Sequence, residues 1–130
     1  MKDIKMTYRD FEVMCAGILK RTYPEPEFSI EFRRLVNTPT RRFIPDIVIR
    51  RISGEVYVAD CKYYQPGKRR VDKNTVKDLE TYRSLMDADH AFILASEGAD
   101  ITQRAIVYAK GFPVSIIRVR ESDTNIHLEI

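Results

Sequence analysis

Two aspartates and a lysine fall on one face of a β-hairpin that the sequence predicts. Residues 52–54 form a three-residue connection that ends in Gly54, and such loops commonly need a positive φ at the third position. This register places Asp46 directly opposite Asp60, with their Cβ atoms roughly 5 Å apart. Lys62 lies two residues beyond Asp60 and therefore points to the same face. The hairpin thus brings two acids and one base to a single place.

Two neighbouring carboxylates repel each other, and the repulsion costs stability unless a positive charge lies between them. A hard divalent cation with oxygen ligands is the simplest resolution, so this face predicts a metal site. The alternative is a purely structural ion pair between Lys62 and one of the aspartates. The other residues on this face are Val48, Val56 and Val58. If this face served only for packing, we would expect apolar residues such as valine at positions 46, 60 and 62 as well. The charged residues there therefore favour the metal site.

Positive charge is concentrated on both sides of this hairpin. Residues 33–51 contain six arginines and one acid, and residues 62–77 contain six lysines or arginines and one acid, although the net charge of the whole chain is only +3. A segregated positive face favours polyanions as partners, while a solvated basic surface would show the same composition. The candidate phosphate contacts are Arg41 and Arg42 before the Asp46 strand, and Lys68, Arg69 and Arg70 in a glycine-containing loop after Lys62.

The composition of the 130 residues is typical of one globular domain spanning residues 1–130. Apolar residues make up 44% and charged residues 32%. The apolar runs are far shorter than the roughly 20 residues that span a bilayer, and the first twenty residues lack the apolar core of a signal peptide. Two cysteines and two histidines exclude a disulfide scaffold and leave almost no ligands for a zinc site. We therefore expect a cytoplasmic domain without membrane association.

Hydrophobic periodicity predicts the elements that position these residues. In chain order they are a helix from Thr7 to the prolines at 24 and 26, strands at 28–32, 44–51 and 55–63, a helix at 72–86, a strand at 91–96, a helix that Asp100 caps and Gly111 closes, and a strand from Val114, with 125–130 as an extra edge. This order predicts an α/β sandwich in which helices cover both faces of a mixed sheet.

The hairpin resembles the PD-(D/E)xK motif of restriction-endonuclease-like nucleases. It matches that motif with Pro45-Asp46, a spacer of 13 residues and Asp60-Cys61-Lys62. The order of the surrounding elements is similar too, and residues 92–109 resemble the second half of Mrr-type catalytic domains. The resemblance implies a restriction-endonuclease-like three-layer α/β/α sandwich with a central mixed β-sheet.

The resemblance also implies a role for each residue of the motif. Asp46 and Asp60 would hold Mg²⁺ or Mn²⁺, with the main-chain carbonyl of Cys61 as a further oxygen ligand. Lys62 would orient the attacking water and offset charge on the phosphate. The metal would supply a hydroxide-like nucleophile and stabilise charge on the phosphate oxygens. The reaction implied is hydrolysis of a phosphodiester bond.

Glu12 is a further catalytic candidate. At about 100° per residue it lies roughly 20° from Leu19 around the first helix, on the shoulder of the apolar stripe. Many members of the superfamily have a glutamate on this helix that faces the metal site. The alternative is a solvent-facing acid that complements the helix N-terminus.

These observations predict a metal-dependent DNA endonuclease. A Holliday-junction resolvase of the same fold is the second interpretation, because archaeal resolvases are domains of similar size with the same motif. A non-catalytic nucleic-acid-binding module is the third, although an intact Asp46, Asp60 and Lys62 argues against it. RNA remains open as a substrate. Cutting both strands of DNA usually needs two sites, which by analogy favours a homodimer.

Overall fold

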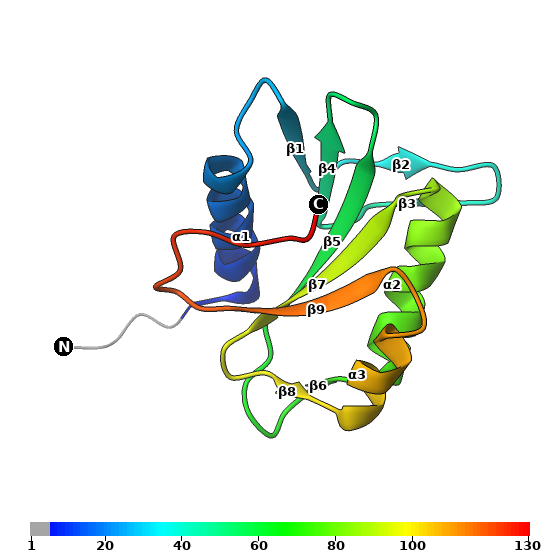
Figure 1. The fold of residues 1–130 in the computed structure, drawn as a ribbon. Helices are drawn as coiled ribbons and strands as arrows, with labels where there is room; N and C mark the ends of the chain where they lie inside the picture. Colours follow the sequence, from blue (N-terminus) through cyan, green and yellow to red (C-terminus); the bar gives the residue numbers. More distant parts are fainter. Residues whose placement is uncertain (1–5) are drawn as a thin grey trace.

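The structure, a computed structural model, describes residues 6–130 and has a five-stranded sheet at its centre (Figure 1). In spatial order the strands are β1 (Phe28–Phe32), β4 (Ile47–Arg51), β5 (Val56–Lys62), β7 (His90–Ser96) and β9 (Val114–Val119). The pairs β1–β4 and β4–β5 are antiparallel, whereas β5–β7 and β7–β9 are parallel. The mixed sheet that the sequence predicts is therefore confirmed, with β5 in the middle.

Helices cover both faces of this sheet (Figure 1). The helix α1 (Tyr8–Thr22) packs on one face, and α2 (Lys73–Met86) and α3 (Gln103–Ala109) pack on the other. Thr7 and Asp72 start the first two helices, each through a reciprocal capping box with the residue three positions later. The three-layer α/β/α sandwich is confirmed. No helix within residues 6–130 has both the length and the apolar character needed to cross a membrane.

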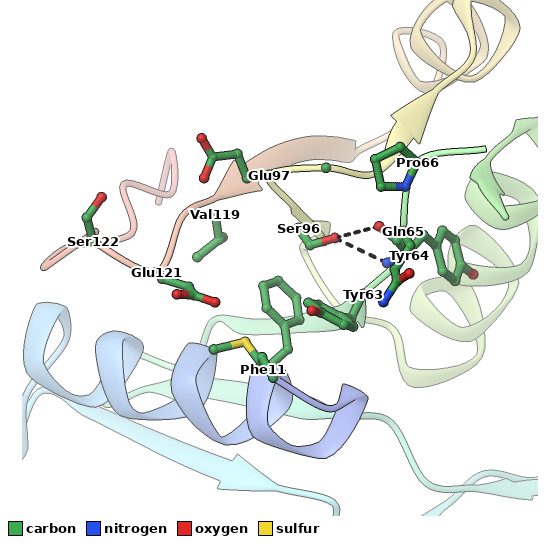
Figure 2. A pocket seen from close by; sticks show the side chains of 12 residues that line it. Phe11, Tyr63, Tyr64, Gln65, Pro66, Ser96, Glu97, Val119, Glu121 and Ser122 are labelled. Atoms are coloured by element: carbon green, nitrogen blue, oxygen red, sulfur yellow. Dashed lines mark hydrogen bonds between the residues drawn. The ribbon is translucent and has the colours of Figure 1, made fainter. Parts of the chain in front are cut away.

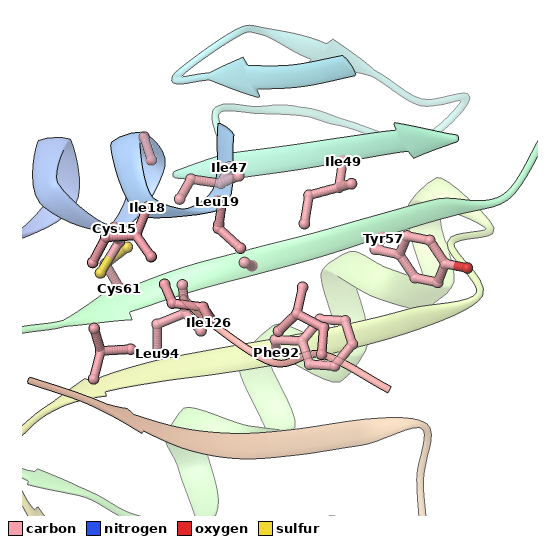
Figure 3. Close-up of a cluster of buried hydrophobic side chains, with 14 of the residues drawn as sticks. Cys15, Ile18, Leu19, Ile47, Ile49, Tyr57, Cys61, Phe92, Leu94 and Ile126 are labelled. Atoms are coloured by element: carbon pink, nitrogen blue, oxygen red, sulfur yellow. The ribbon is translucent and has the colours of Figure 1, made fainter. Parts of the chain in front are cut away.

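The sheet divides the core into two apolar layers. Leu19 of α1 meets Ile47 and Cys61 in the first layer, which Figure 3 shows. Val58 meets Val76 of α2 in the second layer. Neighbouring residues of a strand point to opposite faces, so β4 and β5 contribute to both layers. Burying each large side chain stabilises the fold by roughly 1.5–3 kcal/mol, which fixes the two strands that position the aspartates.

The hairpin of β4 and β5 has the register that the sequence predicts. Val48 is paired with Val58 and Ile47 with Ala59, so Asp46 and Asp60 are the residues that follow directly at the end of this ladder. In the turn, Gly54 has a φ of 110°, a conformation that side chains other than hydrogen rarely allow. Because a shift of one residue would move every side chain to the other face, this turn decides where the two acids lie.

Two short ribbons replace part of the predicted strands and loops. The strand expected over residues 44–51 begins only at Ile47, and residues just before it form β3 (Arg42–Phe43), which pairs with β2 (Val36–Asn37). The segment after the motif forms β6 (Arg70–Val71), which pairs in parallel with β8 (Asp100–Ile101). Strands of only two residues are too short to produce a periodic pattern in the sequence.

Two other predictions near the C-terminus are wrong. The N-cap of α3 is Thr102, whose side chain accepts a hydrogen bond from the N–H of Ala105, while the expected cap Asp100 lies in β8. Residues 125–130 form no strand. Instead, Ile126 and Leu128 are buried in the layer beneath α1. The alternation of apolar residues there reflects packing against the core and not pairing with a neighbouring strand.

Candidate active site

The β4–β5 ladder ends before Pro45, and this leaves the main chain of Cys61 without a partner on β4, although Cys61 is paired with Leu94 of β7 on the other side. The N–H of Arg51 donates to the carbonyl of Glu55, so this residue pair is a hydrogen-bonded one. Hydrogen-bonded pairs alternate along an antiparallel ladder, and the register makes Pro45 and Cys61 the next such pair after Ile47. Proline has no N–H to donate. The Cys61 carbonyl is therefore released from the ladder beside the two aspartates.

Two side chains take the place of the missing strand. The Asp46 carboxylate accepts a hydrogen bond of 2.7 Å from the N–H of Cys61. The Tyr8 hydroxyl, at the start of α1, donates a hydrogen bond of 2.5 Å to the carbonyl of Cys61. Burial and the nearby charges of Asp46 and Asp60 raise the pKa of Tyr8 above its ordinary value, so its hydroxyl remains a donor. Two side chains thus satisfy the main-chain groups at the end of β5 that face β4.

Asp46 and Asp60 interact directly at this end of the hairpin. Burial of Asp46 raises its pKa to about 8, and a hydrogen bond with Asp60 and the charge of Asp60 act in the same direction. The hydrogen bond from the Cys61 N–H lowers it in part. Without a cation, the two carboxyl groups therefore hold a proton at neutral pH. The repulsion expected from the sequence is present in the structure.

Lys62 approaches the same pair from the next position on its face. Its Nζ lies 2.9 Å from Oδ2 of Asp60, and 22% of the lysine side chain and 27% of the aspartate side chain are exposed. Burial lowers the pKa of Lys62, but the charge of Asp60 and the hydrogen bond with it outweigh that effect and raise it overall. Lys62 therefore stays protonated and within reach of a molecule bound at the site.

The donors at this end of the hairpin fit a hard divalent cation. They are two carboxylates and one main-chain carbonyl, all oxygen, and Mg²⁺ is commonly bound through one or two carboxylates with water completing its shell. Within residues 6–130, no three side chains of the histidine, cysteine, aspartate or glutamate type are placed to hold a metal by themselves. A cation here would therefore depend on Asp46, Asp60 and the carbonyl of Cys61 together with water.

Glu12 lies near these groups, but another residue holds its carboxylate. Only 1% of Glu12 is exposed, and Nη1 of Arg33 lies 3.2 Å and 3.0 Å from its two carboxylate oxygens. The alternative of a solvent-facing acid at the helix N-terminus is therefore wrong. Asp10 performs that function, because its side chain accepts from the N–H of Thr7 in the capping box. The charge of Glu12 still reaches the site, where it raises the pKa of Asp46 slightly.

A cleft of about 480 Å³ opens beside Asp60 and Lys62, between β5 and α2. Its other lining residues are Tyr64, Arg69, Arg70, Asp72, Asn74, Thr75, Asp78, Leu79 and Tyr82. The guanidinium of Arg69 lies 5.2 Å from the ring centre of Tyr64, and that of Arg41 lies 5.2 Å from the ring centre of Tyr82. Two of the predicted phosphate-binding arginines therefore stand at the rim through contacts with aromatic rings.

The predicted basic segments are held in different ways. Arg42 lies in β3 and Lys68 in the turn before β6; both are exposed, and neither lines the cleft. The segment before β6 is not a free loop, because the N–H of Gly67 donates to Asp100 and the β6–β8 pairing fixes Arg70. Pro66 also lies close to Gly98, where an added Cβ would come within 3.2 Å of the proline ring. Arg69 and Arg70 are therefore presented to the cleft from an anchored segment.

The sequence matches the Mrr catalytic-domain family of restriction endonucleases over residues 4–121. The chain belongs to this family. No curated protein shows significant sequence similarity to it. The family that the motif and its spacing predict is therefore confirmed, and the catalytic roles of Asp46, Asp60, Lys62 and Glu12 remain predictions.

Solved structures share the fold of this restriction-endonuclease domain. EndoMS in complex with double-stranded DNA aligns with a TM-score of 0.60 and 16% identity, over 94% of this chain and 48% of that one. McrB with bound McrC from Thermococcus gammatolerans gives 0.64 and 17%, over 95% and 30%. A repair endonuclease from Pyrococcus abyssi gives 0.59 and 15%, over 93% and 50%. The domain thus spans half or less of each of these three chains.

A second hollow of about 390 Å³ in the restriction-endonuclease domain is lined by residues 63–66, which follow Lys62 (Figure 2). Phe11 and Tyr63 line it with apolar surface, and their ring centres are 5.5 Å apart. Glu97 and Glu121 also line it, so it carries negative charge. The cleft with the arginines therefore suits a polyanion better than this hollow does.

The contributions of Tyr8 and Arg33 to the site are not among the predictions from the sequence. Tyr8 lies one turn before Glu12 on an apolar stripe, where an aromatic residue is expected to be part of the core. Arg33 follows β1 with a φ of 53°, and its contact with Glu12 joins residues 21 positions apart. The signal that could have found Tyr8 is Pro45, because a missing N–H opposite Cys61 requires another donor.

Proposed function

We propose that this domain hydrolyses phosphodiester bonds in DNA with the help of Mg²⁺ or Mn²⁺. The observation that carries the proposal is the meeting of Asp46, Asp60 and the released carbonyl of Cys61 beside Lys62. Asp60 raises the pKa of Asp46, so placing the two acids side by side costs stability, and a strand pair built only for packing would avoid it. Membership in a restriction-endonuclease family supports the same chemistry.

In this proposal each residue of the candidate site has one role. Asp46, Asp60 and the Cys61 carbonyl hold the cation, which when bound supplies a hydroxide-like nucleophile near neutral pH and stabilises charge on the phosphate. Lys62, already protonated and partly exposed, donates to the attacking water or to a phosphate oxygen. Glu12, held by Arg33, sets the position of α1 and adds negative charge behind the carboxylates.

DNA is the proposed substrate because positively charged arginine side chains lie at the rim of the cleft. Arg69 and Arg70 line it from one side, and Arg41 packs over Tyr82 on α2. Such side chains contact phosphates without reading bases, so they fit a nucleic acid backbone of any sequence. One of the structures with this fold, EndoMS, is bound to double-stranded DNA. Cutting both strands of a duplex would take two copies of the site, which favours a homodimer.

A substrate panel tests the proposal directly. Purified protein with Mg²⁺ or Mn²⁺ is incubated with linear duplex DNA, single-stranded DNA, a four-way junction and RNA, and products are resolved by electrophoresis. We expect metal-dependent cleavage of DNA that EDTA stops and that Asp60→Ala lacks. Selective resolution of the junction would assign the resolvase activity instead. DNA binding without cleavage under every metal would leave only a binding module.

Lys62→Ala separates a catalytic lysine from a structural ion pair. The variant should cleave at least ~100-fold more slowly and unfold at nearly the parental temperature, because Lys62 is partly exposed and its ion pair contributes little to stability. Thermal unfolding and single-turnover cleavage measure the two effects. A variant that unfolds early while its folded fraction cleaves at the parental rate would make the lysine a structural residue.

A further inference from the structure

The carbonyl of Cys61 is the one proposed metal ligand that a mutation of its own residue cannot remove. Its orientation depends on what holds the end of β5, because Pro45 does not donate to it. The Tyr8 hydroxyl donates to this carbonyl at 2.5 Å, across 53 positions of sequence. A carbonyl oxygen has two lone pairs, so one hydrogen bond leaves the second free for a cation.

Tyr8 is held where its hydroxyl can do this. It is the first residue of α1, directly after the Thr7 cap, and the capping box between Thr7 and Asp10 fixes the start of the helix. Phe11, one turn further on, is 2% exposed and anchors the same helical turn in the core. Tyr8 itself is 39% exposed. The ring is therefore only partly packed into the core, and the hydrogen bond of its hydroxyl joins it to the Cys61 carbonyl.

We propose that Tyr8 is a positioning residue that holds the Cys61 carbonyl in place as a ligand for the divalent cation. This inference rests on the proposed function, because it assumes that the cation binds Asp46 and Asp60. The hydroxyl remains on one lone pair of the carbonyl while the cation takes the other. Partners behind a metal ligand typically change metal affinity by about 10–100-fold, so the expected effect is large enough to measure.

The test compares Tyr8→Phe with the parental protein in direct Mn²⁺ binding. Isothermal titration calorimetry and the electron paramagnetic resonance signal of free Mn²⁺ both give a Kd without any cleavage. Tyr8→Phe keeps the ring and loses the hydroxyl, and it should weaken Mn²⁺ binding by ~10-fold or more. Cleavage at saturating Mn²⁺ should recover to near the parental rate, because the carboxylates and Lys62 are unchanged.

Tyr23→Phe is the matched control. Its hydroxyl also donates to a main-chain carbonyl, that of Leu128 at 3.3 Å, and it accepts from the N–H of Leu128 at 2.8 Å. Tyr23 caps the opposite end of α1. This variant should lose thermal stability and keep the parental Kd for Mn²⁺. An equal loss of affinity in both variants would mean that any loosened α1 weakens the site, and it would overturn the specific role of Tyr8.

The remaining outcomes separate this inference from the function on which it rests. If parental protein binds Mn²⁺, Asp60→Ala does not, and Tyr8→Phe binds as tightly as the parent or more tightly, the site is real and the role of Tyr8 is wrong. Parental affinity with a lower rate at saturating Mn²⁺ would also overturn it, by placing the hydroxyl on the substrate. If Asp60→Ala binds Mn²⁺ like the parent, the proposed function itself fails.

Discussion

Two sets of acids lie near each other in this domain, one buried and one half-buried, and they are neutralised differently. Glu12 has both carboxylate oxygens on the guanidinium of Arg33, at 3.0 Å and 3.2 Å. Asp46 and Asp60 share the single amine of Lys62, which contacts Asp60. Asp46 is left with the N–H of Cys61 and with its acidic neighbour. The charge of Glu12 is therefore balanced by Arg33, whereas the two aspartates have one positive charge between them.

This difference indicates a structural role for one set of acids and a catalytic role for the other. A buried acid with a dedicated arginine is a satisfied group, and breaking the pair leaves an uncompensated charge. A pair of acids in which the pKa of one, Asp46, is raised has unbalanced negative charge that a cation can neutralise. We therefore expect variants of the Glu12–Arg33 pair to lower stability, and variants of the Asp46–Asp60 pair to lower activity.

The largest effect is expected for Asp60→Ala. Removing one of two carboxylate ligands should lower single-turnover cleavage by ~10³-fold or more, equal to about 4 kcal/mol of transition-state stabilisation. The same variant removes one of two repelling acids, so the metal-free protein should unfold at or above the parental temperature. Cleavage at the parental rate in saturating Mg²⁺ would show that the metal site is assigned to the wrong residues.

Arg33→Ala should have the opposite profile. It leaves the Glu12 carboxylate buried without a partner, and the loss of a buried pair costs about 3–5 kcal/mol. Because 42% of the Arg33 side chain is exposed, water reduces the cost to ~2 kcal/mol. Chemical denaturation measures it, and Glu12→Gln with Arg33→Ala should restore part of the loss. If Arg33→Ala keeps full stability and loses only cleavage, the two sets of acids do not differ as we infer.

The pH dependence of stability should identify Asp46. Its pKa is about 8 in the folded protein and roughly 3.9 in an unfolded chain, so between these values the folded state keeps a proton that the unfolded state has released. The free energy of unfolding therefore falls as the pH rises from about 4 to 8. Asp46→Asn removes this loss, so it should stabilise the metal-free protein more at pH 8.5 than at pH 4.5, by ~1 kcal/mol or more.

Thermal unfolding in EDTA at the two pH values measures this difference, and Asp10→Asn is the control. The hydrogen bonds from Thr7 lower the pKa of Asp10, so its contribution to stability is present above the unfolded pKa and is lost as the pH falls. Both pH values lie above the unfolded pKa of 3.8, so the control should destabilise the protein nearly equally at pH 8.5 and at pH 4.5. An equal change in melting temperature for Asp46→Asn at both pH values would contradict the raised pKa.

The smallest effect is expected at the rim of the cleft. Changing Lys68, Arg69 and Arg70 to serine should weaken binding of unrelated DNA sequences to similar extents, because side chains that bind phosphates do not read bases. The plot of log K against log salt should flatten by roughly 0.9 for each phosphate that the variant no longer neutralises. Fluorescence anisotropy from roughly 50 to 300 mM salt measures the slope. A serine pair at Lys20 and Arg21, at the far end of α1, is the control and should keep it.

An unchanged slope in the triple variant would make these three residues a solvated surface. Phosphate binding would then be assigned to Arg41 and Arg42. Cleavage at saturating DNA should remain near the parental rate in the triple variant, since Lys62 and the carboxylates are untouched.

The sequence contains enough information to predict the hairpin and its acids. Gly54 and the length of its loop define the register, and the register alone brings Asp46 opposite Asp60. The apolar alternation on both sides of the strands predicts the two covering layers of helices. These features are local, so neighbouring residues determine them.

The rest of the site depends on contacts between distant residues. Arg33 reaches Glu12 from the end of β1, and Tyr8 reaches Cys61 across more than 50 positions. In the sequence, Tyr8 looks like an ordinary packing residue and Arg33 like an ordinary surface residue. The parallel pairing of β6 with β8 brings Asp100 away from the helix cap that its spacing predicts. Such contacts follow from the assembled layers and have no periodic signal in the sequence.

The anchoring of residues 65–71 limits how this domain can acquire a new preference for DNA. The β6–β8 pair, the Gly67–Asp100 hydrogen bond and the close approach of Pro66 to Gly98 fix the length of that segment. An inserted residue there would break all three interactions at once. The tip between β2 and β3, residues 38–41, is held differently, by hydrogen bonds between Thr38 and Arg41 within the turn and by the contact of Arg41 with Tyr82 of α2. Engineering should therefore vary side chains at Arg69 and Arg70, and vary length at the β2–β3 tip.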